Sequence, residues 1–247
     1  MQNVSVRLQT FWMKGRQMDT KQILNQVVSN EQVIDSIESS FQPNHLADLR
    51  KSALSNKTIQ EAPIKSLRPA DVDKTIGYPT CAKSAYEIPY PGTDYSRYKM
   101  FYEEADKINP KTGDERPKYL ARKDSGNRLY IPSKVKQILS NPAISLYITE
   151  GEKKALKAAQ EGINCIAISG LWNWKTKDSD ELISDFDLIA LADRTIGIVP
   201  DNDWLKLDKH GEEKNLKQAV FRLAEKLKKR GARVFIVQLP EESEVYQ

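Results

Sequence analysis

The sequence predicts an α/β protein: a four-stranded, mainly parallel sheet flanked by helices and preceded by a smaller α+β segment. In the carboxyl-terminal half, short apolar runs alternate with helix-like segments, as in a parallel sheet whose faces are covered by helices. Two of these runs end in acidic residues. Upstream, tyrosines and prolines interleave with basic residues, a texture typical of short antiparallel strands.

Composition places the 247-residue chain among ordinary globular proteins, with 39% hydrophobic and 29% charged residues. Its length allows one large or two small domains. The net charge of +4 permits a nucleic-acid partner without requiring one. No apolar run approaches the roughly 20 residues of a membrane span, and the first residues lack a secretory signal. We therefore expect a cytoplasmic protein with no membrane partner.

We expect three segments along the chain. Residues 1–43 form a helical, partly disordered extension, residues 44–140 a small basic and aromatic-rich α+β region, and residues 141–247 the α/β domain. The second segment begins with two short helices, and Ser55 is placed to cap the second of them. This pair is either a plain helical hairpin or a helix-turn-helix of the DNA-reading kind.

The middle region combines aromatic and basic residues. Alternation in Tyr98, Met100 and Tyr102, and again in Leu129 and Ile131, predicts antiparallel strands. The basic residues that we select as nucleic-acid or phosphate contacts are Arg97, Lys99, Lys118, Arg122 and Arg128. Such cations neutralise phosphates, and tyrosine rings stack on unpaired bases. The alternative is a small solvated sheet whose exposed face is basic.

The α/β domain is predicted strand by strand from its apolar runs. Its helices begin at Glu152 and Leu216 and end before Gly162 and Gly231, because glycine suits the left-handed position that closes a helix. The four predicted strands cover residues 146–149, 165–168, 196–199 and 234–239.

Three carboxylates follow two of these strands. Glu150 ends the first strand, and Asp201 and Asp203 follow the third. Chemistry in open α/β sheets collects at the carboxyl ends of strands, and carboxylates there suit Mg²⁺ or Mn²⁺. Lys153 and Lys154, in the first helical turn, could reach a phosphate. The alternative is structural, since acids favour helix starts and Asp-Asn-Asp is a common turn composition.

The arrangement resembles the Toprim domain of bacterial primases, topoisomerases and related nucleases. In that family one strand ends in Glu-Gly and a later strand ends in Asp-x-Asp, which here correspond to Glu150-Gly151 and Asp201-x-Asp203. The sequence is most similar to the Toprim-like domain of uncharacterised plasmid, phage and mobile-element replication proteins, over roughly residues 45–240. The similar stretches include GINCIAISG and PKYLARKDSGNRLYIP.

The resemblance implies a Mg²⁺-dependent site in which Glu150 is a general acid/base and metal ligand and Asp201 and Asp203 bind the metal. It also implies a primase-like role in replicating a mobile element. Two isolated cysteines cannot build the four-cysteine zinc module of primases, and no Gly-x4-Gly-Lys-Ser/Thr motor signature occurs.

Three hypotheses about function follow. The chain could be an enzyme of phosphoryl transfer, with primer synthesis ahead of nucleolytic cleavage, acting on DNA, RNA or nucleotides. It could instead be a module that binds single-stranded DNA or recruits a helicase on a separate chain, without chemistry. In the third hypothesis the acids are structural and the chain is an assembly subunit of a replisome.

Overall fold

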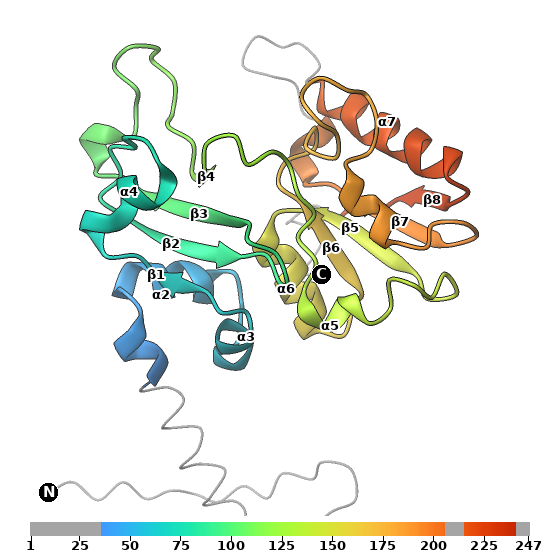
Figure 1. Ribbon diagram of the computed structural model, residues 1–247, viewed down its shortest axis with the longest axis horizontal. Coiled ribbons are helices and arrows are strands. Elements are labelled where there is room, and N and C mark those ends of the chain that lie inside the picture. Colours follow the sequence, from blue (N-terminus) through green and yellow to red (C-terminus); the bar gives the residue numbers. More distant parts are fainter. Residues whose placement is uncertain (1–35, 206–214, 241–247) are drawn as a thin grey trace, which may run out of the picture.

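The computed structural model describes residues 36–205 and 215–240. Two sheets lie side by side: an antiparallel sheet built from the amino-terminal part and a parallel sheet built from the carboxyl-terminal part (Figure 1). Residues 36–40 are helical. The rest of the expected extension, up to residue 35, lies outside the described residues. The structure thus has the predicted α/β architecture, while the exact domain boundaries stay a prediction.

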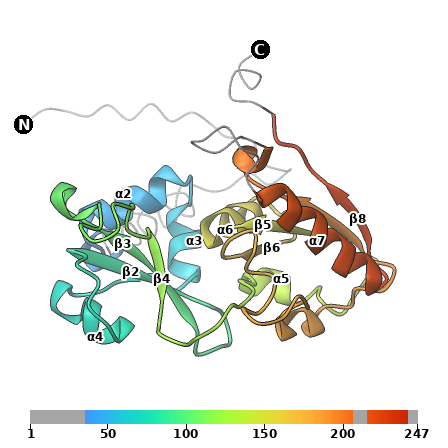
Figure 2. The same ribbon diagram turned by 90° about the horizontal axis from the view of Figure 1, so that it is seen from above.

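The two predicted short helices are present as α2 (Pro43–Lys51) and α3 (Asn56–Glu61). Ser55 caps α3, because its hydroxyl accepts a hydrogen bond from the backbone N–H of Thr58 at 3.2 Å. Gln160 of α6 also accepts a hydrogen bond from the Ser55 backbone at 2.8 Å. These contacts fix α3 beside α6, as both views show (Figure 2).

The antiparallel sheet has the strand order β1-β2-β3-β4. Tyr98 and Met100 are buried on one face of β3, as their alternation predicts. They pack against the short helix α4, whose Val72 and Ile76 are also buried. The strands are β1 (Lys65–Ser66), β2 (Ser84–Pro89), β3 (Ser96–Phe101) and β4 (Tyr119–Ala121). Short helical segments are η1 (Pro69–Asp71), α4 (Val72–Ile76) and η2 (Glu104–Asp106).

The predicted strand around Leu129 and Ile131 is wrong. Only Tyr130 pairs, in an isolated antiparallel bridge with Ala167, where two backbone hydrogen bonds of 2.8 and 2.9 Å form. The chain then enters α5 (Ser133–Lys136), and Pro132, which precedes this helix, has no backbone N–H to donate to a neighbouring strand. The alternation there reflects burial of both side chains against the parallel sheet's core rather than a ladder.

The parallel sheet has the order β6-β5-β7-β8, so the first strand in sequence is central. All three pairings in it are parallel, as predicted. Its strands are β5 (Leu146–Glu150), β6 (Cys165–Ile168), β7 (Thr195–Val199) and β8 (Arg233–Ile236). The helical segments are α6 (Glu152–Gln160), η3 (Ser184–Leu188), η4 (Asn202–Leu205) and α7 (Leu216–Lys229).

The two faces of this sheet are covered by different segments. On one face, α7 and the long connection of residues 169–194 bury the aliphatic side chains of β5, β6 and β7, with Trp174 and Phe186 fully enclosed. On the other face, α6 packs through Ala155 and Leu156 onto β6 and onto the core that it shares with α2 and α3. In the described ranges, no helix is long and apolar enough to cross a membrane.

Candidate functional site at the carboxyl end of the parallel sheet

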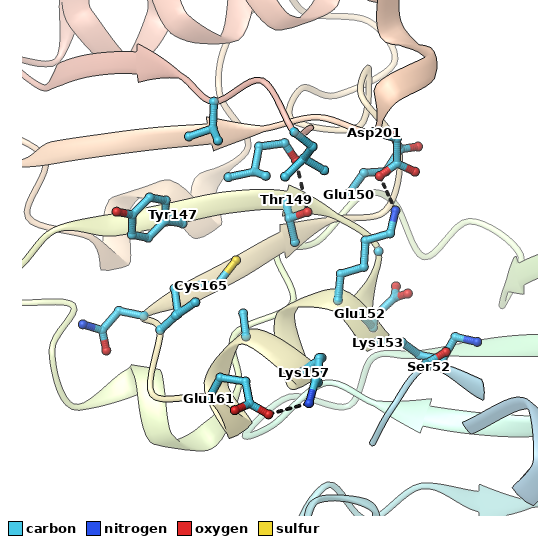
Figure 3. Close-up of a pocket in the computed structure, with 18 of the residues that line it drawn as sticks. Ser52, Tyr147, Thr149, Glu150, Glu152, Lys153, Lys157, Glu161, Cys165 and Asp201 are labelled. Atoms are coloured by element: carbon cyan, nitrogen blue, oxygen red, sulfur yellow. Dashed lines mark hydrogen bonds and ion pairs between the residues drawn. The ribbon is translucent and has the colours of Figure 1, made fainter. Parts of the chain in front are cut away.

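Glu150 and Asp201 meet at one edge of the parallel sheet. Their strands β5 and β7 are neighbours in which Thr149 pairs with Val199, and the Thr149 hydroxyl donates to the Val199 carbonyl at 3.1 Å. Glu150 follows Thr149 directly and Asp201 follows Val199 by two residues, and both carboxylates line a cavity of about 1180 Å³. Figure 3 shows the two side chains next to each other. The structure therefore brings together two of the three predicted acids.

The third acid, Asp203, belongs to the helical turn η4, and its side chain lies outside the described part of the structure. Within the described part, no group of three or more histidine, cysteine, aspartate or glutamate side chains could hold a metal ion. Two carboxylates on one rim nevertheless fit Mg²⁺, because this ion often takes one or two protein carboxylates together with waters and substrate phosphates.

Gly151 shapes the turn that carries Glu150 from strand to helix. Its φ of +92° lies in the left-handed region, which side chains other than glycine rarely adopt. Its backbone N–H donates to the Ile168 carbonyl of β6 at 2.9 Å, so the turn stays bound to the sheet. Glycine is therefore required immediately after Glu150 on conformational grounds alone.

The two predicted phosphate-binding lysines have different contacts. Lys154 forms an ion pair with Asp201 across the rim. Lys153 reaches in the other direction and pairs with Asp48 of α2 at 2.7 Å. Burial would raise the pKa of Asp48, but hydrogen bonds from Lys153 and Tyr86 outweigh it and hold that pKa below its usual value. Both lysines line the cavity, but Lys154 pairs with an acid of the rim, whereas Lys153 joins α6 to α2.

A buried ion pair connects the rim to the antiparallel sheet. The Glu152 side chain is only 2% exposed; it accepts hydrogen bonds from the Tyr90 hydroxyl at 2.6 Å and from Arg97 at 2.9 Å. Arg97 also donates to the Ser169 carbonyl, just after β6, at 3.2 Å. Burial alone would lower the pKa of Arg97, but the charge of Glu152 outweighs burial and raises it. Arg97 is thus bound to residues beside two strand ends of the parallel sheet.

Two of the predicted basic residues lie against the aromatic ring of Tyr119 in β4. The Lys99 ammonium lies 4.8 Å from the ring centroid and the Arg97 guanidinium 5.1 Å from it, distances typical of cation–π contacts. Burial lowers the pKa of Lys99; the charge of Asp48 opposes this shift, and the charges of Lys153 and Lys118 add to it. These cations and the ring form a compact basic and aromatic group beside Glu152.

The remaining basic residues do not continue this group. Arg128 pairs with the largely buried Asp185 at 2.9 Å and so holds the connection after β6. Arg122 lines a separate hollow of about 620 Å³ between α4 and the turn after β4. The five residues predicted as one nucleic-acid surface therefore lie in different surroundings, and their roles stay predictions.

Sequence reasoning missed Glu152, Tyr90 and the Ser169 carbonyl as parts of the site's support. A second acid two positions after Glu150 was visible in the sequence, but its partner Arg97 lies 55 residues away. No local periodicity connects residues that far apart, so only the fold reveals the pair.

Comparison with known proteins agrees with this architecture. A family model described as "Domain of unknown function (DUF3854)" matches residues 135–245. No curated protein matches the sequence. Among solved structures, the zinc-binding and RNA polymerase domains of the Aquifex aeolicus primase align with a TM-score of 0.53 and 17% identity over 92% of this chain. The DnaG catalytic core aligns with a TM-score of 0.50 and 19% identity over 85% of it.

These likenesses concern the fold. The chain has the Toprim-like fold of primase catalytic cores, a parallel four-stranded sheet flanked by helices beside an antiparallel sheet. It spans 59% of the Aquifex aeolicus chain and 72% of the DnaG core chain.

Proposed function

We propose that this chain is a primase-like Toprim protein of mobile-element DNA replication, which carries out Mg²⁺- or Mn²⁺-dependent phosphoryl transfer on nucleic acid. The observation that supports this most is the placement of Glu150 and Asp201 on adjacent strand ends facing one cavity. The fold shared with primase catalytic cores supports a primase-like role.

In this proposal each side chain at the rim has a distinct task. Asp201 and Asp203 bind the metal, and Glu150 binds it or moves a proton to or from the reacting oxygen. The bound metal would supply positive charge that stabilises the phosphoryl group during transfer. Lys154 pairs with Asp201 in this structure and would be free to contact a substrate phosphate if Asp201 held a metal instead. Gly151 and the buried Glu152 keep Glu150 in place.

The nucleic acid in this proposal is single-stranded DNA. The basic and aromatic group of Arg97, Lys99, Lys118 and Tyr119 lies beside Glu152 and so near the cavity that contains the acids. It offers charge for phosphates and a ring for a base. Arg122, Arg128 and Lys153 would contribute more weakly, because the latter two already pair with Asp185 and Asp48.

The experiment is a primer-synthesis assay on a single-stranded DNA template with nucleoside triphosphates and Mg²⁺ or Mn²⁺. We expect labelled primers from the wild-type protein and none from Glu150→Gln. Glu225→Gln, which removes an exposed carboxylate on α7, serves as the matched control and should keep full activity. Equal product from wild type and Glu150→Gln, or no product and no strand cleavage from any variant, would contradict the enzymatic proposal.

A second candidate function is a non-catalytic module that binds single-stranded DNA or recruits a helicase. The Lys154–Asp201 ion pair favours it, because an ammonium group occupies the carboxylate that a metal would need. In that case DNA affinity should be unchanged in Glu150→Gln and fall when Lys99 is replaced by alanine. Fluorescence anisotropy at low salt measures both affinities, and the primer-synthesis assay separates the two candidates, because only the enzymatic one yields primers.

A further inference from the structure

Among the described residues, part of one face of the parallel sheet beside the acidic rim has no helix packed on it. Parallel sheets are normally covered on both faces. Here α6 covers β6 and part of β5, whereas α7 and residues 169–194 cover the opposite face. On the α6 side of β7 and β8, no helix of the described ranges packs, and Phe235 and Leu239 are 42% and 39% exposed. This open area has the character of a binding surface.

The floor of this open sheet face is aromatic. The register places Tyr147, Gly197 and Phe235 side by side across three strands, on the same face. The two rings meet over the glycine, with centroids 6.1 Å apart. A Cβ on Gly197 would lie 2.6 Å from the Tyr147 ring and 2.9 Å from the Phe235 ring, so only glycine lets the rings cover the middle strand. The result is an aromatic floor of two neighbouring rings.

The cavity of about 1180 Å³ is lined by Tyr147 of this floor as well as by Glu150 and Asp201, and Phe235 lies against the Tyr147 ring. Tyr147 lies three residues before Glu150 on β5, which corresponds to about 10 Å along a strand. The wall formed by α6 carries Lys154 and Lys157, paired with Asp201 and Glu161. Further lining residues are Asn164, Val199, Val237 and Leu239. One end is thus apolar, with the two rings edge to face at 88°, and the other end is charged.

We propose that this open sheet face binds the base of a nucleotide, whose phosphates extend toward Lys154 and the acidic rim. This inference rests on the proposed function, since it deepens the same site. A nucleotide matches the cavity because its base is a flat, largely apolar ring system and its phosphates are anionic. Asn164 at the far end offers an amide that can hydrogen-bond a base edge. A protein helix would match the apolar floor but not the acidic rim.

The test compares ATP with tripolyphosphate, which has no base, by isothermal titration calorimetry with Mg²⁺ present. The wild-type protein should bind ATP more tightly than tripolyphosphate. Phe235→Ala should weaken ATP binding about tenfold, as expected for loss of one stacked ring, and leave tripolyphosphate binding unchanged. Phe221→Ala is the matched control, because Phe221 is 51% exposed on α7, and it should leave both unchanged.

A second variant covers the case in which Phe235→Ala perturbs the fold. Val237→Trp adds bulk inside the open cavity, and it should remove the preference for ATP over tripolyphosphate. Equal affinity for both ligands in the wild type, or ATP binding unaffected by both variants, would overturn the proposal. So would self-association that sedimentation equilibrium detects in the wild type and that Phe235→Ala abolishes, since a second copy would then cover this face.

The two proposals fail in different ways. If the base platform is correct and the enzymatic function is wrong, ATP binds with the predicted variant pattern but no primer or cleaved strand appears. If the function is correct and the platform is wrong, primers form and Phe235→Ala retains the wild-type affinity for ATP.

Discussion

The strongest perturbation that the structure offers is Arg97→Met, which removes one member of a buried ion pair. In the wild type, Glu152 is 2% exposed and its carboxylate accepts hydrogen bonds from Arg97 and the Tyr90 hydroxyl. Without Arg97 the carboxylate stays buried with Tyr90 as its remaining hydrogen-bond donor among the contacts described above. Breaking a buried pair in this way typically costs about 3–5 kcal/mol.

The diagnostic step is the double variant Arg97→Met/Glu152→Gln. Glutamine keeps an oxygen that accepts from Tyr90 but carries no charge, so no uncompensated charge remains buried. We expect the double variant to recover about 2 kcal/mol of unfolding free energy relative to Arg97→Met alone, within the range of coupling energies measured for contacting residues.

The assay is equilibrium unfolding in urea, followed by circular dichroism and tryptophan fluorescence for the wild type, both single variants and the double variant. Lys228→Met, which removes an exposed cation on α7, controls for loss of a basic residue and should change stability by less than about 0.5 kcal/mol. A double variant as unstable as Arg97→Met, or a loss below about 1 kcal/mol for Arg97→Met, would refute the reasoning about buried charge.

Three further predictions concern stability and reactivity. Ser55→Ala removes the cap of α3 and should lower the unfolding free energy by about 1 kcal/mol. Ser55→Asp should keep most of the stability that the cap provides, because aspartate also caps helices. Burial lowers the pKa of His45 from 6.5 to about 4, so its folded form resists protonation. The unfolding free energy should therefore have its full value above pH 6.5 and fall by about 3 kcal/mol toward pH 4. The same decline in a His45→Gln variant would contradict this prediction. Burial also raises the pKa of the Cys165 thiol to about 12, while Cys81 is exposed, so one thiol should react with Ellman's reagent in the native protein and two after unfolding; rapid reaction of both would show that Cys165 is accessible.

The sequence was most informative where local pattern and burial agree. The apolar run Cys165–Ile168 is buried at every position, because both faces of this strand are covered, and such a run is visible without any partner. Gly162 and Gly231 have φ of +79° and +87°, so the helix ends that they mark were equally visible. The carboxylates Glu150 and Asp201 could be selected because they follow such strands.

The features that could not be predicted depend on contacts between residues far apart in the sequence. Tyr130 pairs with Ala167 alone, and a single bridge leaves no repeating pattern in the sequence. The long connection that buries Trp174 has no helical or strand periodicity, so its contribution to the core could not be predicted from the sequence. Arg97 was interpreted as a surface cation because nothing near it in sequence reveals that Glu152 will face it.

The central claim is that Glu150 and Asp201 act together on one metal ion, and direct metal binding tests it most directly. We would titrate Mn²⁺ into the wild-type protein, Glu150→Gln, Asp201→Asn and the control Glu225→Gln by isothermal titration calorimetry. The account predicts one site in the wild type and control, weakened at least tenfold in both rim variants. Binding that is absent from the wild type, or unaffected by either rim variant, would contradict the account.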